Sequence, residues 1–192
     1  MKTLIFATHN KHKTKEIKSA VGDSYKILSL EDLDFHEEIK EPFNTLEENA
    51  NAKSSFIHQR FGKSCFADDT GLEIDALDGR PGVFSARYSG EDGNPENNIR
   101  KVLKELEGVE KRSARFRTVI SLILDEKEHL FEGVVEGEIL TKKHGSDGFG
   151  YDPVFRPQGY EQSFAEMPLA LKNEISHRGK AVRKLVEFLK NH

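Results

Sequence analysis

Along the first part of the chain, apolar residues follow first the pattern of a strand, then that of a helix, and then that of a strand again. An unbroken apolar run predicts a buried strand over residues 3–7, and polar residues end it. Apolar residues one turn apart then predict a helix over 11–21, and a second short strand is expected over 25–28. This strand–helix–strand order is typical of an α/β protein.

A longer amphipathic helix is predicted over residues 45–61, where apolar residues return at helical spacings. Thr45 and Glu48 form the Thr-x-x-Glu capping pattern, so Glu48 has a ready explanation in closing the helix start. Lys53 lies inside the apolar stripe. A charge there must either extend to solvent or meet an anion.

The remaining elements follow from the same periods. We expect a strand that ends in acidic residues at 64–68, a helix at 94–106, strands at 115–124 and 130–140, and a final helix at 179–190. The two later strands are joined by residues 125–128 and should form an antiparallel hairpin. Strands separated by helices favour parallel pairing, so the expected fold is α/β with a central mixed β-sheet flanked by helices.

Length and composition limit the possible functions. The 192 residues fit one domain, or one domain with two lobes, and we take 1–192 as a single domain. A net charge of -4 argues against a general nucleic-acid-binding surface. No stretch approaches the roughly 20 apolar residues that cross a bilayer, and the N-terminal apolar run is too short for a signal peptide. We therefore expect a cytoplasmic protein with neither nucleic-acid nor membrane partners.

Cys65 is the single cysteine, which excludes an internal disulfide and any multi-cysteine zinc site. It lies in the apolar approach to the acidic residues, where a buried structural thiol is expected rather than a nucleophile. No Gly-x-Ser-x-Gly nucleophile elbow occurs in the sequence either. Nucleophilic catalysis by a side chain is therefore not indicated.

The segment between the first strand and the first helix is a candidate phosphate-binding turn. Its residues are Thr8, His9, Asn10, Lys11, His12 and Lys13. Backbone amides at a helix N-terminus, together with Lys13, suit phosphate binding, although the Walker P-loop pattern is absent. The alternative is that Asn10 is an ordinary helix N-cap and the lysines are solvated. Taken alone, the segment favours that alternative.

Asp68 and Asp69 form a candidate cation site at the end of the predicted strand. Adjacent residues in a strand point to opposite faces, so the two carboxylates need not share a task. With no histidine or cysteine cluster nearby, oxygen ligands favour Mg²⁺ or Mn²⁺ over zinc. The alternative is a simple turn, because the sequence from Asp68 to Gly71 is rich in turn-forming residues. The two readings are about equally supported by this segment alone.

Two further segments carry residues suited to binding a flat or anionic ligand. In 145–153, glycines bracket Phe149 and Tyr151, either of which could stack on a planar ligand while Asp152 accepts hydrogen bonds. The alternative is a loop whose aromatic rings pack in the core. In 176–179, a hydroxyl, an imidazole and a guanidinium stand at a helix start, with Lys172 shortly before. The alternative there is a capped helix with surface side chains.

The order and spacing of these motifs carry more information than any one of them. The chain resembles the inosine/xanthosine triphosphate pyrophosphatase family over nearly its whole length. The resemblance is carried by Ala7-Thr8-x-Asn10-x-x-Lys13, Glu41, Thr45–Ala50 with Lys53, Ala67–Leu72, Pro81–Tyr88, Gly148–Pro153 and Ser176–Gly179.

The resemblance implies an elongated two-lobed α/β fold with a substrate cleft between the lobes, and a homodimer. It implies hydrolysis of non-standard purine nucleoside triphosphates (ITP, dITP, XTP and dXTP) to the monophosphate and pyrophosphate. By the same resemblance, Glu41 and Asp69 bind Mg²⁺, with Mn²⁺ as a second option. Asp69 is also the general base, Asp68 supports the site, and Thr70 touches the substrate.

The resemblance further assigns the triphosphate and the base to separate residues. Thr8, Asn10 and Lys13 in the phosphate turn, and Lys53 beyond it, would hold the triphosphate. His9 and His12 stand where smaller residues are common, so they could reshape this turn. The residues expected around the base are Phe149, Gly150, Tyr151, Asp152, Lys172, His177 and Arg178.

Two other functions remain open from the sequence. A Maf-like pyrophosphatase would act on dTTP, UTP or modified nucleotides, and residues 176–178 favour the purine substrate over it. A non-catalytic nucleotide sensor would need no reacting groups, and the presence of Glu41, Lys53 and Asp69 weighs against it. Measured turnover across a panel of nucleotides separates all three.

Overall fold

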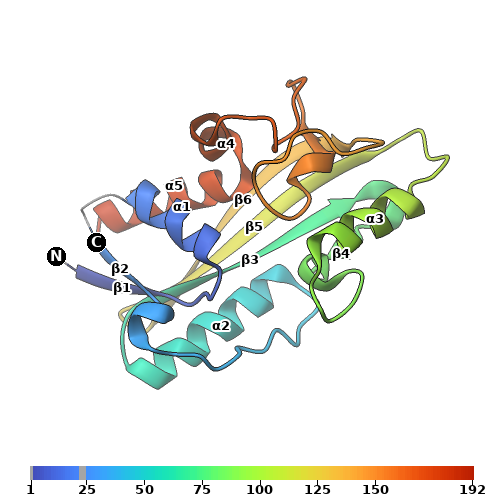
Figure 1. The fold of residues 1–192 in the computed structure, drawn as a ribbon. Coiled ribbons are helices and arrows are strands. Elements are labelled where there is room, and N and C mark those ends of the chain that lie inside the picture. Colours follow the sequence, from blue (N-terminus) through green and yellow to red (C-terminus); the bar gives the residue numbers. More distant parts are fainter. Residues whose placement is uncertain (1, 22–24) are drawn as a thin grey trace. The chain divides into compact units, whose positions relative to one another are not determined.

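The computed structural model describes residues 2–21 and 25–192, which form a mixed β-sheet flanked by helices (Figure 1). The strands are β1 Lys2–Phe6, β2 Tyr25–Ser29, β3 Cys65–Ile74, β4 Pro81–Gly82, β5 Ser113–Leu124, β6 Lys127–Ile139 and β7 Phe155–Pro157. The helices are α1 Lys11–Val21, α2 Leu46–Phe61, α3 Pro95–Glu105, α4 Leu169–Ile175 and α5 His177–Lys190. Short 3₁₀ turns are η2 Glu31–Leu33, η3 Asp75–Leu77, η4 Ser85–Arg87 and η5 Asp152–Val154.

The sheet combines both kinds of strand pairing, as the sequence predicted. Its order is β2-β1-β3-β5-β6-β7, with β4 paired to β3. β1 is parallel to β2 and β3, while β3–β4 and β6–β7 are antiparallel. β5 and β6 are neighbours joined by Asp125 and Glu126, whose positive φ angles of 49° and 63° are those of a tight hairpin turn. The predicted hairpin is confirmed, but its turn is shorter than the predicted connection over 125–128, because β6 begins at Lys127.

The chain divides into two compact units, each built from several segments. Unit 1 comprises residues 1–69, 118–133 and 178–192, and unit 2 comprises residues 70–117 and 134–177. Each unit has its own hydrophobic core. The apolar residues of each unit therefore pack mainly with one another.

In unit 1 the sheet has a core on each face. On one face, α1 and α5 pack on alternate strand residues such as Leu4, Phe6 and Phe66. On the opposite face, α2 packs on the intervening residues, such as Ile5 and Cys65. Figure 1 shows α1 and α5 together on one side of β1 and β3 and α2 on the other. The alternation of side chains along these strands therefore decides which helix each residue meets.

In unit 2 a single core forms between α3 and the adjoining strands. Ile99 and Val102 of α3 pack with Leu72 of β3, Phe116 of β5 and Val135 of β6. The segment after β6, which includes η5 and β7, adds further buried residues: Tyr151, Val154, Phe155, Phe164 and Met167. The aromatic residues of the 145–153 segment thus divide, because Tyr151 enters the core while Phe149 stays half-buried.

Several predicted elements agree closely with the structure. The helix predicted over 11–21 is α1, and the helix predicted from Thr45 is α2, which begins one residue later. Thr45 caps α2 by accepting a hydrogen bond from the Glu48 amide at 3.2 Å, and its hydroxyl donates to the Glu48 carboxylate at 2.8 Å. The capping role proposed for Glu48 is confirmed.

Two predictions about elements were wrong. The strand expected at 64–68 is β3, which continues to Ile74, so the Asp68–Gly71 segment is strand and not a turn. A Cβ at Gly71 would lie 2.8 Å from the Gly82 carbonyl oxygen, so glycine serves the close approach of β4. The sequence also gave no sign of α4, and the final helix begins at His177 rather than 179.

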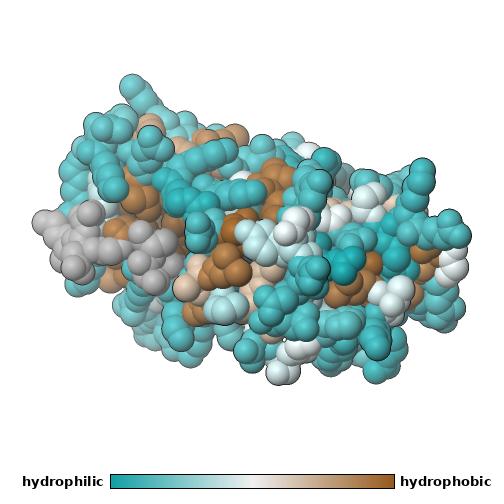
Figure 2. Space-filling view, turned by 90° about the horizontal axis from the view of Figure 1, so that it is seen from above, coloured by the Kyte–Doolittle hydropathy of each residue, from teal (hydrophilic) through white to brown (hydrophobic). Residues whose placement is uncertain are grey.

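Hydrophilic and apolar residues share the face of the molecule that Figure 2 shows. Figure 2 shows one face on which hydrophilic residues dominate and apolar residues form scattered patches. Among residues 2–21 and 25–192, no helix combines the length and apolar character needed to cross a bilayer.

Candidate functional site

Asp68 and Asp69 lie next to each other in β3 but point to opposite faces of the sheet. Asp68 follows the alternation of Phe66 and lies on the face covered by α1 and α5. Asp69 follows the alternation of Cys65 and lies on the face covered by α2. Both are buried, with exposed fractions of 1% and 7%. The expectation that the two carboxylates serve different groups is confirmed by their contacts.

On the first face, Asp68 is held between cations from two helices. Lys13 of α1 lies 2.9 Å from Asp68 Oδ2, and Arg178 Nε of α5 lies 3.5 Å from the same oxygen. Burial alone would raise the pKa of Asp68, but Lys13, Arg178 and Lys53 outweigh it and hold that pKa well below its usual range. Burial, opposed by Asp68, lowers the pKa of Lys13. Asp68 is therefore a charged anchor that holds two cations in place.

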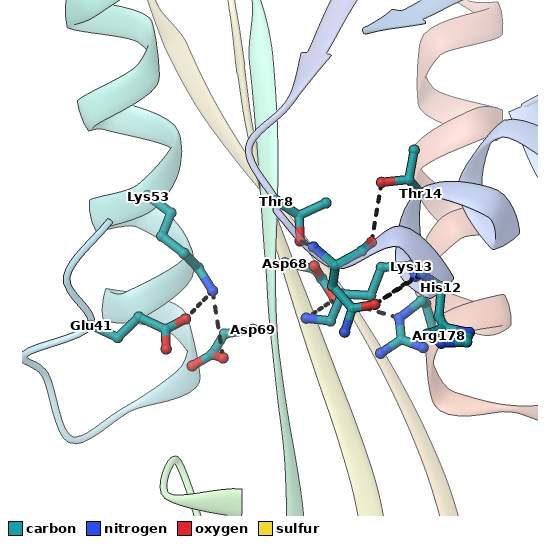
Figure 3. A network of polar contacts seen from close by, with 10 residues as sticks. Thr8, His12, Lys13, Thr14, Glu41, Lys53, Asp68, Asp69 and Arg178 are labelled. Carbon is teal, nitrogen blue, oxygen red and sulfur yellow. Dashed lines mark hydrogen bonds and ion pairs between the residues drawn. The ribbon is translucent and has the colours of Figure 1, made fainter. Parts of the chain in front are cut away.

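On the second face, Lys53 of α2 joins two carboxylates. It contacts Glu41 directly and lies 3.7 Å from Asp69 Oδ1 (Figure 3). Burial would lower the pKa of Lys53, but Asp69 and Glu41 outweigh it and raise that pKa. Burial, opposed by Lys53 and reinforced by Glu41, raises the pKa of Asp69 to about 6. Of the two outcomes expected for a lysine in the apolar stripe of α2, extension to solvent or contact with an anion, the structure shows the second.

The candidate phosphate turn is organised by Asn10. Its Oδ1 accepts hydrogen bonds from the amides of His12 at 3.0 Å and Lys13 at 3.2 Å, so Asn10 is the N-cap of α1. Thr8 Oγ1 accepts from the Asn10 amide at 3.1 Å. The alternative reading of Asn10 as a helix cap is therefore correct, and the cap also fixes the start of α1 beside Lys13.

The side chains of this turn do not all point to the same place. Lys13 reaches the buried Asp68, whereas Lys11 is exposed and pairs with Glu31 at 3.0 Å. His9 Nε2 lies 2.9 Å from the carbonyl oxygen of Glu37, and its ring stacks on Phe35. His9 thus links the turn to the segment that leads to Glu41.

The donor set around Lys53 fits a small divalent cation. In the described part of the chain, no three His, Cys, Asp or Glu side chains form a cluster that could hold a metal by themselves. Mg²⁺ does not require such a cage, because it commonly uses one or two protein carboxylates with water and substrate phosphates. Glu41 and Asp69 offer carboxylate oxygens only, and both already converge on one cation, the Lys53 ammonium.

Unit 2 contains a second buried ion pair, in aromatic surroundings. Lys172 of α4 lies 2.7 Å from Asp152 Oδ2, and the two side chains are only 7% and 5% exposed. The same oxygen accepts a hydrogen bond from the Phe149 amide at 2.8 Å. Lys172 Nζ lies 5.0 Å from the centroid of the Phe149 ring. A Cβ at Gly148, which has a φ of 80°, would collide with the Asp152 carboxylate, so glycine is required there.

The structure also decides between the alternatives for the segment at 176–179. His177 and Arg178 are 5% and 4% exposed, so the reading of both as surface residues is wrong. The His177 ring stacks on Phe116 with centroids 4.7 Å apart and planes 13° apart. His177 belongs to unit 2, whereas Arg178 belongs to unit 1 and contacts Asp68. Ser176 is buried as the C-cap of α4.

Three further candidate residues, Thr70, Gly150 and Cys65, lie in β3 or in the loop before η5. Thr70 and Gly150 are half-buried, in β3 and in the loop before η5. Cys65 is fully buried, and burial raises the pKa of its thiol to about 12, as expected for a structural thiol.

Sequence reasoning missed the polar residues that support the aromatic loop. Ser85 in η4 and Asn98 in α3 are both buried, and the carbonyl oxygen of Ser85 accepts the hydroxyl proton of Tyr151. A signal was present, because Asn98 lies one turn before the apolar Val102 on the buried stripe of its helix. A polar residue at a core position of a helix indicates a buried partner, as Lys53 also did.

Together, the fold and these two groups of residues define an α/β protein with a buried, cation-rich carboxylate site in one unit and an aromatic, ion-paired loop in the other. The chain belongs to the Ham1 family, whose pattern it matches over residues 4–188.

Relatives and solved structures agree with this membership. The chain is 51% identical to a dITP/XTP pyrophosphatase of Flavobacterium johnsoniae, covering 97% of each chain, and 52% identical to one of Porphyromonas gingivalis, covering 98% of each. Its fold is similar to that of the Staphylococcus aureus Ham1 protein, with a TM-score of 0.91, 37% identity and 99% of each chain covered. A HAM1 protein from Coxiella burnetii gives a TM-score of 0.92 at 36% identity over 100% of each chain.

Proposed function

We propose that this protein is a nucleoside triphosphate pyrophosphatase that hydrolyses non-standard purine nucleotides such as dITP, ITP, XTP and dXTP. Family membership over residues 4–188 and the names of relatives near 50% identity support this activity. The observation in the molecule that supports it best is that Asp68 and Asp69 meet different cations, Lys13 and Arg178 for Asp68 and Lys53 for Asp69. The enzyme would act in the cytoplasm, on the nucleotide pool.

The triphosphate would be bound in unit 1. The groups proposed for it are Thr8, His9, Asn10, Lys11, His12, Lys13 and Lys53. The amides at the start of α1 and the buried Lys13 provide positive charge at one place, and Lys53 provides it at another. Asp68 would support this arrangement by keeping Lys13 and Arg178 in position.

Glu41 and Asp69 would hold Mg²⁺, or Mn²⁺ in its place, because their oxygen donors converge on one cation position. When bound, the metal supplies neutralisation of the phosphate charge. Lys53 would share the two carboxylates and contribute its own charge to the phosphates. Glu41 lies on the segment before α2 and Asp69 in β3, so the two donors come from different elements.

Asp69 would act as the general base for the reaction. It would take a proton from a water molecule as the water oxygen attacks the α-phosphorus. The bond between the α-phosphorus and the bridging oxygen breaks, and pyrophosphate leaves with that oxygen. Lys13 and Lys53 would stabilise the charge that develops on the phosphate oxygens. Thr70, the next residue in β3, would contact the substrate.

The base would be recognised mainly by residues of unit 2. The proposed groups are Phe149, Gly150, Tyr151, Asp152, Lys172 and His177, with Arg178 following in the chain. Phe149 is the half-buried ring of the loop and is therefore the better candidate for stacking. A 6-oxo purine offers an acceptor to Lys172 or Arg178, whereas adenine offers an amino group that would leave these donors unpaired.

We further propose that residues 1–192 act as one pyrophosphatase domain and that two copies form a homodimer. The single family match over residues 4–188 supports the first part. Light scattering of the purified protein tests the second part.

The function is tested by initial rates over a panel of nucleotides with separate detection of pyrophosphate and orthophosphate. We expect pyrophosphate as the first product from dITP and XTP, only with Mg²⁺ present, and much slower turnover of ATP and GTP. Preferred turnover of dTTP or UTP would instead indicate a Maf-like enzyme. Metal-dependent binding without turnover would indicate a sensor.

A further inference from the structure

Tyr151 belongs to the proposed base-recognition loop, but its hydroxyl group is bound within the protein. Its Oη donates to the carbonyl oxygen of Ser85 over 2.7 Å, and only 4% of Tyr151 is exposed. A phenol has one proton to donate, and here that proton is used in a buried hydrogen bond. Tyr151 can therefore contribute its ring to the loop, and the place of that ring depends on Ser85.

Ser85 is itself held firmly by its neighbours. Its Oγ accepts a hydrogen bond from the Leu72 amide of β3 at 2.9 Å and donates to the Gly82 carbonyl oxygen at 2.6 Å. Its carbonyl oxygen accepts the hydrogen bond from the Tyr151 hydroxyl and a second one from Asn98 Nδ2 at 3.4 Å. Ser85 thus connects β3, the β4 turn, α3 and Tyr151.

The Asn98 side chain forms hydrogen bonds with both ends of the turn from Ser85 to Ser89. Its Nδ2 also donates to the carbonyl oxygen of Ala86 at 3.0 Å. Its Oδ1 accepts from both the amide and the hydroxyl of Ser89, each at 2.7 Å. Asn98 is 3% exposed and lies on the apolar side of α3, where an amide is costly unless its hydrogen bonds are made. All of these bonds go to the turn.

The loop from Phe149 to Asp152 is therefore tied down at two points. Asp152 is fixed by Lys172 and by the Phe149 amide, and Tyr151 is fixed by the Ser85 carbonyl oxygen. The first tie uses residues already assigned to base recognition. The second leads to Asn98. Its side chain bonds Ser85, Ala86 and Ser89, which are not among the residues proposed to bind the base.

We propose that Asn98 is a positioning residue for base selectivity, acting through the Ser85 carbonyl oxygen and the Tyr151 hydroxyl. This inference rests on the proposed function, because it takes the Phe149–Asp152 loop as the part that recognises the base. Loosening the 85–89 turn lets the Tyr151 ring and its loop shift, so the contacts that distinguish a 6-oxo purine from adenine weaken. The reacting groups of unit 1 are not altered by the change.

The test compares Asn98→Ala, Tyr151→Phe and the double variant with the unaltered protein. Kinetic constants are measured for dITP and dATP with pyrophosphate detection. Each single change is expected to raise the KM for dITP about threefold to tenfold, the size expected for one hydrogen bond, with kcat nearly unchanged. The preference for dITP over dATP falls by a similar factor. The double variant should be no worse than the poorer single variant, because both act through one carbonyl oxygen.

Asn97→Ala is the matched control, since Asn97 is the neighbouring residue of the same type on α3 and only its backbone amide takes part in the cap of that helix. It should leave the KM and the nucleotide preference unchanged. Thermal unfolding shows whether each variant is folded at the assay temperature. Should Asn98→Ala not fold, Asn98→Ser and Tyr151→Phe provide the same comparison with less loss of packing.

Folded variants with lower melting temperatures but unchanged KM and preference would overturn this role and leave the proposed function intact. A Tyr151→Phe effect without any Asn98 effect would also overturn it, because the hydroxyl would then act on the substrate directly. Failure of the unaltered protein to hydrolyse dITP would instead overturn the proposed function, and this role with it.

Discussion

The two compact units bury their charged side chains in different ways. Unit 1 gathers six charged groups around adjacent residues of one strand: Lys13, Glu41, Lys53, Asp68, Asp69 and Arg178. Unit 2 buries one pair, Lys172 with Asp152, and places the lysine ammonium 5.0 Å and 5.8 Å from the rings of Phe149 and Phe164. Unit 1 gathers many charges at one place, whereas in unit 2 a buried ion pair lies beside aromatic rings.

Under the proposed function, this difference matches the two chemical halves of a nucleotide substrate. A triphosphate and its metal require several charges whose mutual repulsion and attraction are balanced, as they are around Asp68 and Asp69. A purine requires flat apolar surfaces and a few well-placed polar groups, as are found around Lys172. Changes in unit 1 should therefore affect turnover, and changes in unit 2 should affect affinity, preference and stability.

The largest expected effect is that of Asp69→Asn in unit 1. Replacing the proposed base by its uncharged isostere should lower kcat for dITP by about 10² to 10⁴-fold. The KM should change far less, because the groups of unit 2 are untouched. Pyrophosphate release is the measurement, with the exposed Glu107→Gln as a control. Near-normal kcat in Asp69→Asn would contradict the assignment of the base.

The next effect concerns the ion pair of unit 2. Lys172→Met leaves the Asp152 carboxylate buried without its cation and should lower the free energy of unfolding by about 3 kcal/mol. Urea denaturation followed by circular dichroism measures this. Adding Asp152→Asn should restore part of the loss, because the stranded charge is removed. The same change at the exposed Lys142 should have little effect, and an equal loss there would show that the pair is not the cause.

A smaller effect is expected from the metal side of unit 1. Glu41→Gln removes one anionic donor and should raise the Mg²⁺ concentration for half-maximal rate about tenfold. At saturating Mg²⁺ the rate should return to within a few-fold of normal. Initial rates over a Mg²⁺ series measure this. Glu38→Gln on the same exposed segment is the control, and an equal shift in that variant would argue against a specific role for Glu41.

The smallest effect is expected at the surface of unit 1, at Asp32. The amide of Ser29 donates to its carboxylate at 2.8 Å, and this bond, with help from Lys18, lowers the pKa of Asp32 to about 2. Because the folded-state pKa is depressed, the stabilisation is present above about pH 4 and is lost as the pH falls through about 2. The side chain is 41% exposed, so Asp32→Asn should cost less than about 1 kcal/mol at pH 7.

Urea denaturation of both proteins at pH 7, 5 and 3 measures this difference. The two unfolding free energies should approach each other at the lowest pH. A difference that stays constant with pH would mean that the charge of Asp32 is not what stabilises the protein.

Most elements could be predicted from the sequence, because helix and strand periods are local properties. The capped helix from Thr45 and a hairpin connected within residues 125–128 were predicted for that reason. β3 was cut short because Asp68–Gly71 has the composition of a turn, and only the pairing with β4 shows why a glycine stands in that strand. α4 was not predicted because its seven residues are too few to show the apolar period of a helix.

The sequence by itself determined the family, the main elements and the fact that Asp68 and Asp69 must point apart, because alternation along a strand follows from backbone geometry. It also indicated that Lys53 must either extend to solvent or meet an anion. Only the tertiary structure decided which partners each carboxylate has, and that Arg178 joins Asp68 while His177 packs on Phe116. It alone revealed Asn98 as the support of Tyr151, since partners distant in sequence meet only when the chain has folded.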